Sequence, residues 1–158
     1  AALLRAAQES GLNTAIESTA CAPMETIRRL LPYLDHYLMD IKHIDREKHK
    51  RFTTRDNDLI LQNAALLAKE ARHLVIRVPV VPGFNDTESE IAGIARFTAG
   101  ILPGGEIHLL PYHRLGTDKY RGLNREYTLS EILPPPDEKM QQLKAVAEGF
   151  GLRCQIGG

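Results

Sequence analysis

The 158-residue sequence contains no tryptophan and only two cysteines, and no apolar run in it reaches the length that spans a membrane. Cys21 and Cys154 lie far apart and belong to no CxxC or CxxxCxxC cluster. The sequence therefore encodes no visible zinc or iron–sulfur site, and we expect two reduced thiols in a cytoplasmic protein. Nothing resembles a signal peptide, so no membrane partner is expected.

An excess of charge of either sign is also missing, because 20 basic residues balance 20 acidic residues. This balance excludes non-specific attraction to nucleic acid or to acidic membrane surfaces as the basis of function. The length is typical of one domain with a single core. The chain begins without methionine inside an amphipathic helical pattern, and we expect it to be a piece of a longer protein.

What the sequence does contain is a regular alternation of apolar strands and amphipathic helices. The patterns predict strands over residues 13–18, 37–42, 74–81, 107–112 and 152–156. They predict helices over residues 24–34, 45–52, 56–72, 86–101 and 134–149. The expected fold class is therefore α/β: an incomplete (β/α) TIM-like barrel with about four parallel strands, flanking helices and a C-terminal strand. Asp56 is expected to cap the third helix, and Pro79 indicates an irregular or edge position for the third strand.

The pair Asp40 and Lys42 is the most informative polar feature. Residues i and i+2 of an extended strand point to the same face, so the two charges emerge side by side at the end of a buried strand. The two charges could simply neutralise each other, but desolvating both would scarcely stabilise the fold. We therefore favour a role in ligand binding, at the strand edge where β/α folds usually bind ligands.

Further polar residues are expected at the same edge. Glu17 and Ser18 end the first strand, Arg77 lies in the third, and His113 follows the fourth. Arg77 needs a partner, which could be Glu17, Asp40 or a substrate carboxylate. Such a cluster suits a zwitterionic ligand, with the cations holding a carboxylate and the acids holding an ammonium, ribose hydroxyls or a small cation. The remaining histidines lack metal-ligand spacing and are interpreted as solvated or structural: His36, His43, His49, His73 and His108.

Several stretches together resemble one known family. They are Asp40-Ile41-Lys42 followed by Asp45 and His49, the run Ile-Arg-Val-Pro-Val-Val-Pro-Gly-Phe-Asn-Asp at 76–86, and Leu-Leu-Pro-Tyr-His-Arg-Leu-Gly at 109–116. In order and spacing they resemble the radical S-adenosylmethionine enzymes that activate glycyl-radical enzymes. The family implies reductive cleavage of S-adenosylmethionine to a 5′-deoxyadenosyl radical, which takes hydrogen from a glycine of a partner such as pyruvate formate-lyase or a relative.

The resemblance implies roles for six residues as cofactor-binding groups. Asp40 and Lys42 would contact the methionine end of S-adenosylmethionine, and Glu17 and Ser18 would shape that site. Arg77 and His113 would make the remaining strand-end contacts, to the methionine carboxylate or the nucleoside. The loop 115–127 would lie where the partner's glycine loop approaches.

The sequence also departs from the family pattern. Thr54 stands where the family usually has glycine, and the CxxxCxxC motif of the [4Fe-4S] cluster and the Gly-Gly-Glu segment are absent. Both would lie upstream of Ala1, so residues 1–158 are expected to be the C-terminal part of a partial (β/α)6 barrel. This piece would contain no metal ligand and no catalytic residue, and it would be inactive alone.

Two rival hypotheses stay open at this point. The segment 40–45 fits a DxKxxD pattern that resembles barrel decarboxylases, and Lys42 could serve as the Schiff-base lysine of an aldolase. Alternatively, the chain is a non-catalytic protein-binding module whose charges pair internally.

Overall fold

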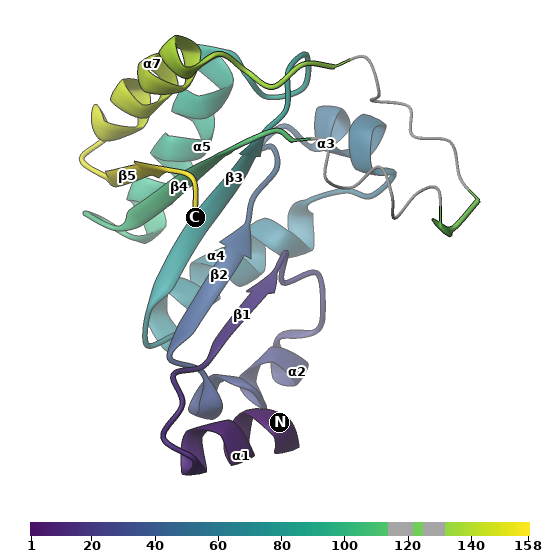
Figure 1. Ribbon diagram of the computed structural model, residues 1–158, viewed down its shortest axis with the longest axis vertical. Coiled ribbons are helices and arrows are strands. Elements are labelled where there is room, and N and C mark those ends of the chain that lie inside the picture. Colours follow the sequence, from purple (N-terminus) through teal and green to yellow (C-terminus); the bar gives the residue numbers. More distant parts are fainter. Residues whose placement is uncertain (114–121, 125–131) are drawn as a thin grey trace.

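Five parallel strands form one open sheet in the computed structural model, which describes residues 1–113, 122–124 and 132–158 (Figure 1). The strands are β1 (Ala15–Ser18), β2 (His36–Asp40), β3 (Leu74–Val80), β4 (Glu106–Pro111) and β5 (Arg153–Ile156). Their order in the sheet is β1-β2-β3-β4-β5, and each pairs in parallel with the next. The expected α/β class and the unclosed barrel-like sheet are confirmed.

Helices join the strands, as the alternation predicts. They are α1 (Ala2–Glu9), α2 (Met24–Arg28), α3 (Arg46–Thr53), α4 (Asp58–Glu70), α5 (Glu88–Ile101) and α7 (Asp137–Glu148), with a short 3-10 turn η1 (Leu31–Tyr33). The single helix expected over 24–34 is wrong: α2 ends at Arg28, and Pro32 opens the separate turn because it has no backbone N–H to donate. No helix within the described ranges is long and apolar enough to cross a bilayer.

The start of α4 also differs from expectation. Its N-cap is Asn57 rather than Asp56, and no side chain caps the helix there. The Asp56 carboxylate instead accepts a hydrogen bond from Arg46 at 3.3 Å.

One face of the sheet is covered by helices and forms the core. The helices α4 and α5 lie behind the sheet in Figure 1. The strand side chains that face them are at most 2% exposed: Tyr37, Met39, Ile76, Val78, Ile107 and Leu109. Burial of this apolar layer supplies the main driving force for the fold.

The opposite face, turned toward the viewer in Figure 1, carries no helix among the described residues. Side chains that alternate with the core positions lie here, and most of them are partly buried or exposed, with Val75 as a buried exception. Asp40, Arg77 and His108 are direct neighbours across β2, β3 and β4. The open face therefore carries polar and charged side chains at these positions, whereas the core face is apolar.

The expectation of an edge position at Pro79 is wrong, because β3 is the central strand. The pairing of β2 with β3 ends where the backbone N–H of Ile41 donates to the carbonyl of Arg77 at 2.9 Å. The next rung would need an N–H from Pro79, which has none. Proline is tolerated in the central strand since β2 has already ended beside it.

Candidate functional site

Four of the predicted site residues form a chain of alternating charges across three strands. Arg77 Nη1 lies 2.5 Å from Glu17 Oε1, and Arg77 Nε lies 3.8 Å from Asp40 Oδ1. Asp40 Oδ2 in turn lies 3.2 Å from Lys42 Nζ. Arg77 thus contacts both of the acids that the sequence offered as partners. We call Glu17, Arg77, Asp40 and Lys42 the charged row.

The charged row is not fully satisfied by its own members. The side chain of Arg77 is 16% exposed and that of Asp40 is 23% exposed. Arg77 Nε and Asp40 Oδ1 are buried atoms without a hydrogen-bond partner, and their separation of 3.8 Å is too long for a hydrogen bond. A buried polar atom left unpaired costs roughly 1–3 kcal/mol. The row therefore retains unused hydrogen-bonding capacity that a polar ligand can satisfy.

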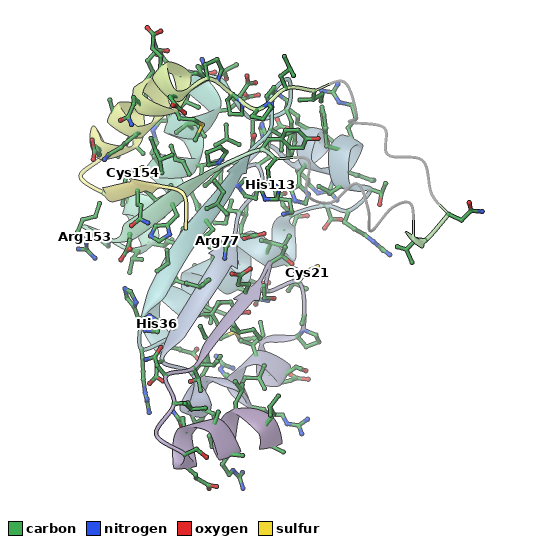
Figure 2. The ribbon with its side chains drawn as sticks, in the orientation of Figure 1. Cys21, His36, Arg77, His113, Arg153 and Cys154 are labelled. Atoms are coloured by element: carbon green, nitrogen blue, oxygen red, sulfur yellow. The ribbon has the colours of Figure 1, made fainter. Side chains whose placement is uncertain are left out.

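A hollow of about 420 Å³ lies beside Glu17 and Arg77, at one end of the row. Its lining residues are Glu17, Leu38, Arg77, His108, Leu110, Pro111, His113, Gly157 and Gly158. Figure 2 shows Arg77 on the sheet and His113 just beyond the end of β4. The volume is within the range of small-molecule sites, and the lining combines apolar side chains with a few convergent polar groups. Glu17, Arg77 and His113 therefore share one hollow, and Arg77 connects it to Asp40 and Lys42.

Ser18 lies apart from the charged row. Adjacent residues of a strand point to opposite faces, so Ser18 faces away from Glu17. Its Oγ accepts a hydrogen bond from the backbone N–H of Ala20 at 3.0 Å. Burial raises the pKa of Tyr37, and the interaction of its hydroxyl with Ser18 opposes that rise. Ser18 therefore contributes to the helix-covered side of β1, and its role in cofactor binding stays a prediction.

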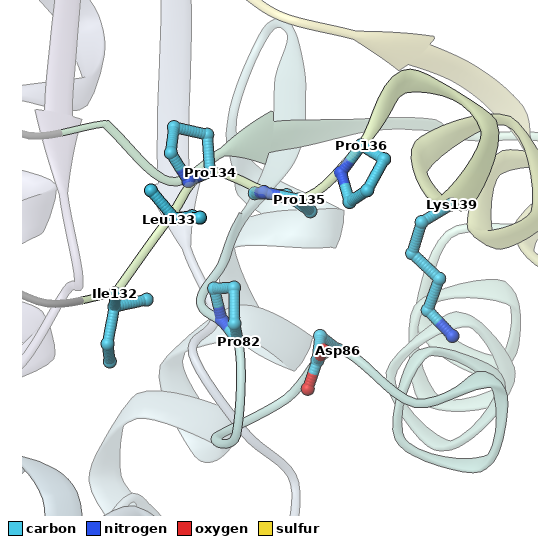
Figure 3. Close-up of a pocket in the computed structure, with 8 residues that line it drawn as sticks. All are labelled: Pro82, Asp86, Ile132, Leu133, Pro134, Pro135, Pro136 and Lys139. Atoms are coloured by element: carbon cyan, nitrogen blue, oxygen red, sulfur yellow. The ribbon is translucent and has the colours of Figure 1, made fainter.

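A second hollow, of about 700 Å³, lies between the β3–α5 connection and the segment before α7 (Figure 3). It is lined mainly by apolar residues: Pro82, Ile132, Leu133, Pro134, Pro135 and Pro136, with Asp86 and Lys139 as its charged groups. Asp86 Oδ1 already accepts a hydrogen bond from the backbone N–H of Gly83 at 2.9 Å. None of the predicted site residues lines this hollow. The smaller hollow is the better candidate because three predicted site residues, Glu17, Arg77 and His113, line it.

The described residues contain no group of three or more His, Cys, Asp or Glu side chains that could hold a metal ion. Cys21 is exposed, whereas Cys154 is buried, and burial raises the pKa of its thiol to about 11. His43 and His49 are buried structural residues, as expected. His108, however, lines the hollow beside Arg77, a position that the sequence interpretation missed. The alternation of Ile107 and Leu109 with polar neighbours was the signal that could have found it.

The loop 115–127, expected to face a partner, falls outside the described residues apart from 122–124. Its proposed role is therefore untested.

Comparison with known proteins shows clear relatives, although no family model matches the chain. The chain is 39% identical over 156 residues to the indoleacetate decarboxylase activating enzyme of Tractidigestivibacter scatoligenes, covering 98% of this chain and 49% of that protein. It is 46% identical over 133 residues to the isethionate sulfite-lyase activating enzyme of Desulfovibrio desulfuricans, covering 83% of this chain and 42% of that protein. The chain spans about half the length of the curated relatives it matches.

Among solved structures, the chain is similar to a domain of pyruvate-formate lyase-activating enzyme from Bacteroides vulgatus. The TM-score is 0.81 at 29% identity, and the match covers 99% of this chain and 88% of that domain.

Proposed function

The chain is homologous to the activating enzymes of glycyl-radical enzymes, and on this premise we propose that it forms part of such an enzyme. In this proposal residues 1–158 are the C-terminal part of a partial (β/α)6 barrel in a cytoplasmic protein. The enzyme acts on a glycyl-radical enzyme, either pyruvate formate-lyase or a relative. The charged row with its unpaired buried atoms is the observation that carries the proposal.

The residues of the row fit the amino-acid end of S-adenosylmethionine. Lys42 and Arg77 offer cationic donors for a carboxylate, and Arg77 Nε has no hydrogen-bond partner of its own. Asp40 offers an unpaired carboxylate oxygen, Oδ1, to an ammonium or hydroxyl group. His113 lines the same hollow and is assigned to the nucleoside side. Glu17 already neutralises Arg77 and keeps it oriented along the sheet.

When bound beside a reduced [4Fe-4S] cluster, S-adenosylmethionine supplies the one-electron chemistry that removes a hydrogen atom from a glycine. The part of this chain in that chemistry is to bind and orient the methionine end and to exclude water. The described residues offer no ligand set for the cluster, so the proposal assigns its cysteines to another part of the enzyme.

Binding of S-adenosylmethionine to this chain tests the assignment directly. We expect saturation-transfer NMR to detect the ligand on the wild-type chain and to show much weaker transfer with Lys42→Ala. Lys144→Ala is a matched control, since the Lys42 and Lys144 side chains are both 33% exposed and each pairs with an acid. Equal transfer with the two variants would refute the assignment of Lys42.

Activity is tested with the complete reading frame, expressed and reconstituted without oxygen. We expect methionine formation and a glycyl-radical signal in electron paramagnetic resonance when a glycyl-radical enzyme is present. The 158-residue chain alone, reconstituted with iron and sulfide, is expected to form no methionine. Methionine formation by that chain would overturn the assignment of the cluster to another part of the enzyme.

A further inference from the structure

Three buried asparagines hold the backbone that follows the site strands. Asn57, Asn63 and Asn85 are each at most 1% exposed. Every one of them uses its side-chain Nδ2 to donate to two backbone carbonyls. Burying an amide is unfavourable unless it is hydrogen-bonded, so each side chain is committed to the loop it holds.

Asn85 links β3 to the β2–α3 loop just beyond the hydrogen bond that Pro79 cannot make. Its Nδ2 donates to the carbonyl of Lys42 at 2.7 Å and to the carbonyl of Pro79 at 2.8 Å. Its Oδ1 accepts from the backbone N–H of Val81 at 2.8 Å. A side chain from the β3–α5 connection therefore joins β3 to the backbone of Lys42, just beyond the last rung between β2 and β3.

Asn57 continues this hold along the same loop. Its Nδ2 donates to the carbonyl of His43 at 2.7 Å and to that of Ile44 at 3.0 Å. Three consecutive carbonyls, from Lys42 to Ile44, are thus held by side chains from two other connections. Asn63 acts in the same manner on the loop after β1, at the carbonyls of Ala20 and Ala22.

We propose that Asn85 and Asn57 are positioning residues for Lys42. The residues 42–45 lie outside any strand or helix, so without these hydrogen bonds the turn could reorient. Held on its carbonyl side by two buried amides, the turn keeps the Lys42 amine 3.2 Å from Asp40. A site of this kind depends on preorganised groups, because mobile groups must be ordered at a free-energy cost on binding. The contribution of this positioning to catalysis rests on the proposed function. The positioning of Lys42 by the two asparagines does not depend on it.

Competitive acetylation of the folded chain with acetic anhydride tests the proposal, with mass spectrometry reporting the labelling of Lys42 relative to Lys144. Asn85→Ala and Asn57→Ala are expected to raise this ratio by about threefold or more, since the amine leaves Asp40 when the turn opens. Asn63→Ala is the matched control: it also removes two hydrogen bonds from a buried amide, but it acts on the loop after β1. Its ratio is expected to equal that of the wild type.

A second variant covers a failure of Asn85→Ala to fold. Asn85→Asp keeps the size and the acceptor of the side chain but loses both donors, so it should also raise the ratio. An unchanged ratio in the folded Asn85 and Asn57 variants would overturn the proposal. So would an equal rise in Asn63→Ala, because it would indicate general loosening.

Repeating the labelling with S-adenosylmethionine separates this proposal from the proposed function. Protection of Lys42 by the ligand in the wild-type chain supports the binding role. If Asn85→Ala raises the labelling ratio but S-adenosylmethionine does not protect Lys42 in the wild type, the positioning role of Asn85 is supported. The proposed contact between Lys42 and S-adenosylmethionine is then contradicted.

Discussion

Glu90 connects the first turn of α5 to the loop that follows Lys42, and its replacement by glutamine should weaken the fold in a pH-dependent way. Glu90 Oε2 accepts hydrogen bonds from the backbone N–H and the hydroxyl of Thr87, at 3.1 and 2.7 Å, in a capping box. Its Oε1 contacts the ammonium of Lys48 and lies 3.4 Å from His43 Nε2. The Glu90 side chain is only 14% exposed. One carboxylate therefore both caps a helix and fixes the β2–α3 connection.

The magnitude follows from the pKa of this carboxyl. Burial alone would raise the pKa of Glu90, but hydrogen bonds from Lys48, Thr87 and His43 outweigh it and lower the pKa to about 2. The drop from the ordinary value of 4.5 corresponds to roughly 3 kcal/mol, at about 1.4 kcal/mol for each pKa unit. A lowered carboxyl pKa stabilises the fold above pH 4.5, and that stabilisation is lost as the pH falls toward 2.

His43 changes stability in the same direction. Burial lowers its pKa, with Glu90 opposing that effect, so folding favours the neutral imidazole. Protonation below its ordinary value of 6.5 therefore also destabilises the fold.

Urea unfolding followed by circular dichroism at pH 7, 5 and 3 measures the effect. Glu90→Gln keeps an amide oxygen for the Thr87 cap but loses the charge, so we expect its free energy of unfolding at pH 7 to fall by about 2–3 kcal/mol. The gap from the wild type should narrow by pH 3. Glu88→Gln is the control, since Glu88 is an exposed acid in the same helical turn. Equal losses in the two variants, or a gap that stays constant from pH 7 to 3, would refute the reasoning.

Three further outcomes are expected. Iodoacetamide at pH 8 should alkylate Cys21 in the folded chain and leave Cys154 unmodified until the chain unfolds, since Cys154 is buried and its pKa is raised to about 11. Equal alkylation rates of the two cysteines, measured by mass spectrometry, would contradict this. Met39→Ala, at a side chain that is 0% exposed, should lower the free energy of unfolding by about 2–5 kcal/mol in urea titrations. Tyr37→Phe should lower the free energy of unfolding by about 1 kcal/mol or less, because it removes the interaction of the tyrosine hydroxyl with Ser18, and an unchanged midpoint would argue against that interaction.

The periodicity of the sequence predicts the five strands and most of the helices because burial on one face is repeated along each element. The parallel direction of neighbouring strands follows from the connections, each of which contains a helix. Local interruptions are harder to predict. Pro32 stops a helix that its apolar neighbours would otherwise extend, although the missing N–H was visible in the sequence.

Pro79 shows a limit of a different kind. A proline inside a strand predicts that the strand lies at the edge of its sheet, because the missing N–H interrupts the backbone hydrogen bonds to one of the two neighbouring strands. The structure leaves the strand central, since the neighbour on that side ends before the proline and Asn85 links β3 to the loop that follows. The sequence pattern cannot predict this, because the compensating amide comes from a separate loop.

The charged row itself could be predicted in part from spacing. The expected strand over 37–42 ends at Asp40, so strand alternation does not extend to Lys42, although Lys42 Nζ still lies 3.2 Å from Asp40 Oδ2. Within β1 the alternation does separate Glu17 from Ser18. There, the alternation of side chains is enough to place Ser18 outside the row. The contact of Arg77 with Glu17 depends on the sheet order, in which their strands are separated by β2.

The geometry of Arg77 and Asp40 bears on whether the row serves the fold or a ligand. A row that serves the fold alone gains most when every buried donor and acceptor is paired, since each unpaired atom costs free energy. Here the two atoms that face each other, Arg77 Nε and Asp40 Oδ1, stand 3.8 Å apart and are both unpaired. Meanwhile, the side-chain nitrogens of buried amides hold the adjoining backbone at normal hydrogen-bond distances, 2.7 Å at the carbonyls of both Lys42 and His43, although Asn57 Oδ1 also has no partner. A rigid frame around an incompletely paired row is the arrangement that a preorganised binding site requires. The polar atoms of the row lose their water when the chain folds, and a ligand that binds there gives them hydrogen-bond partners again.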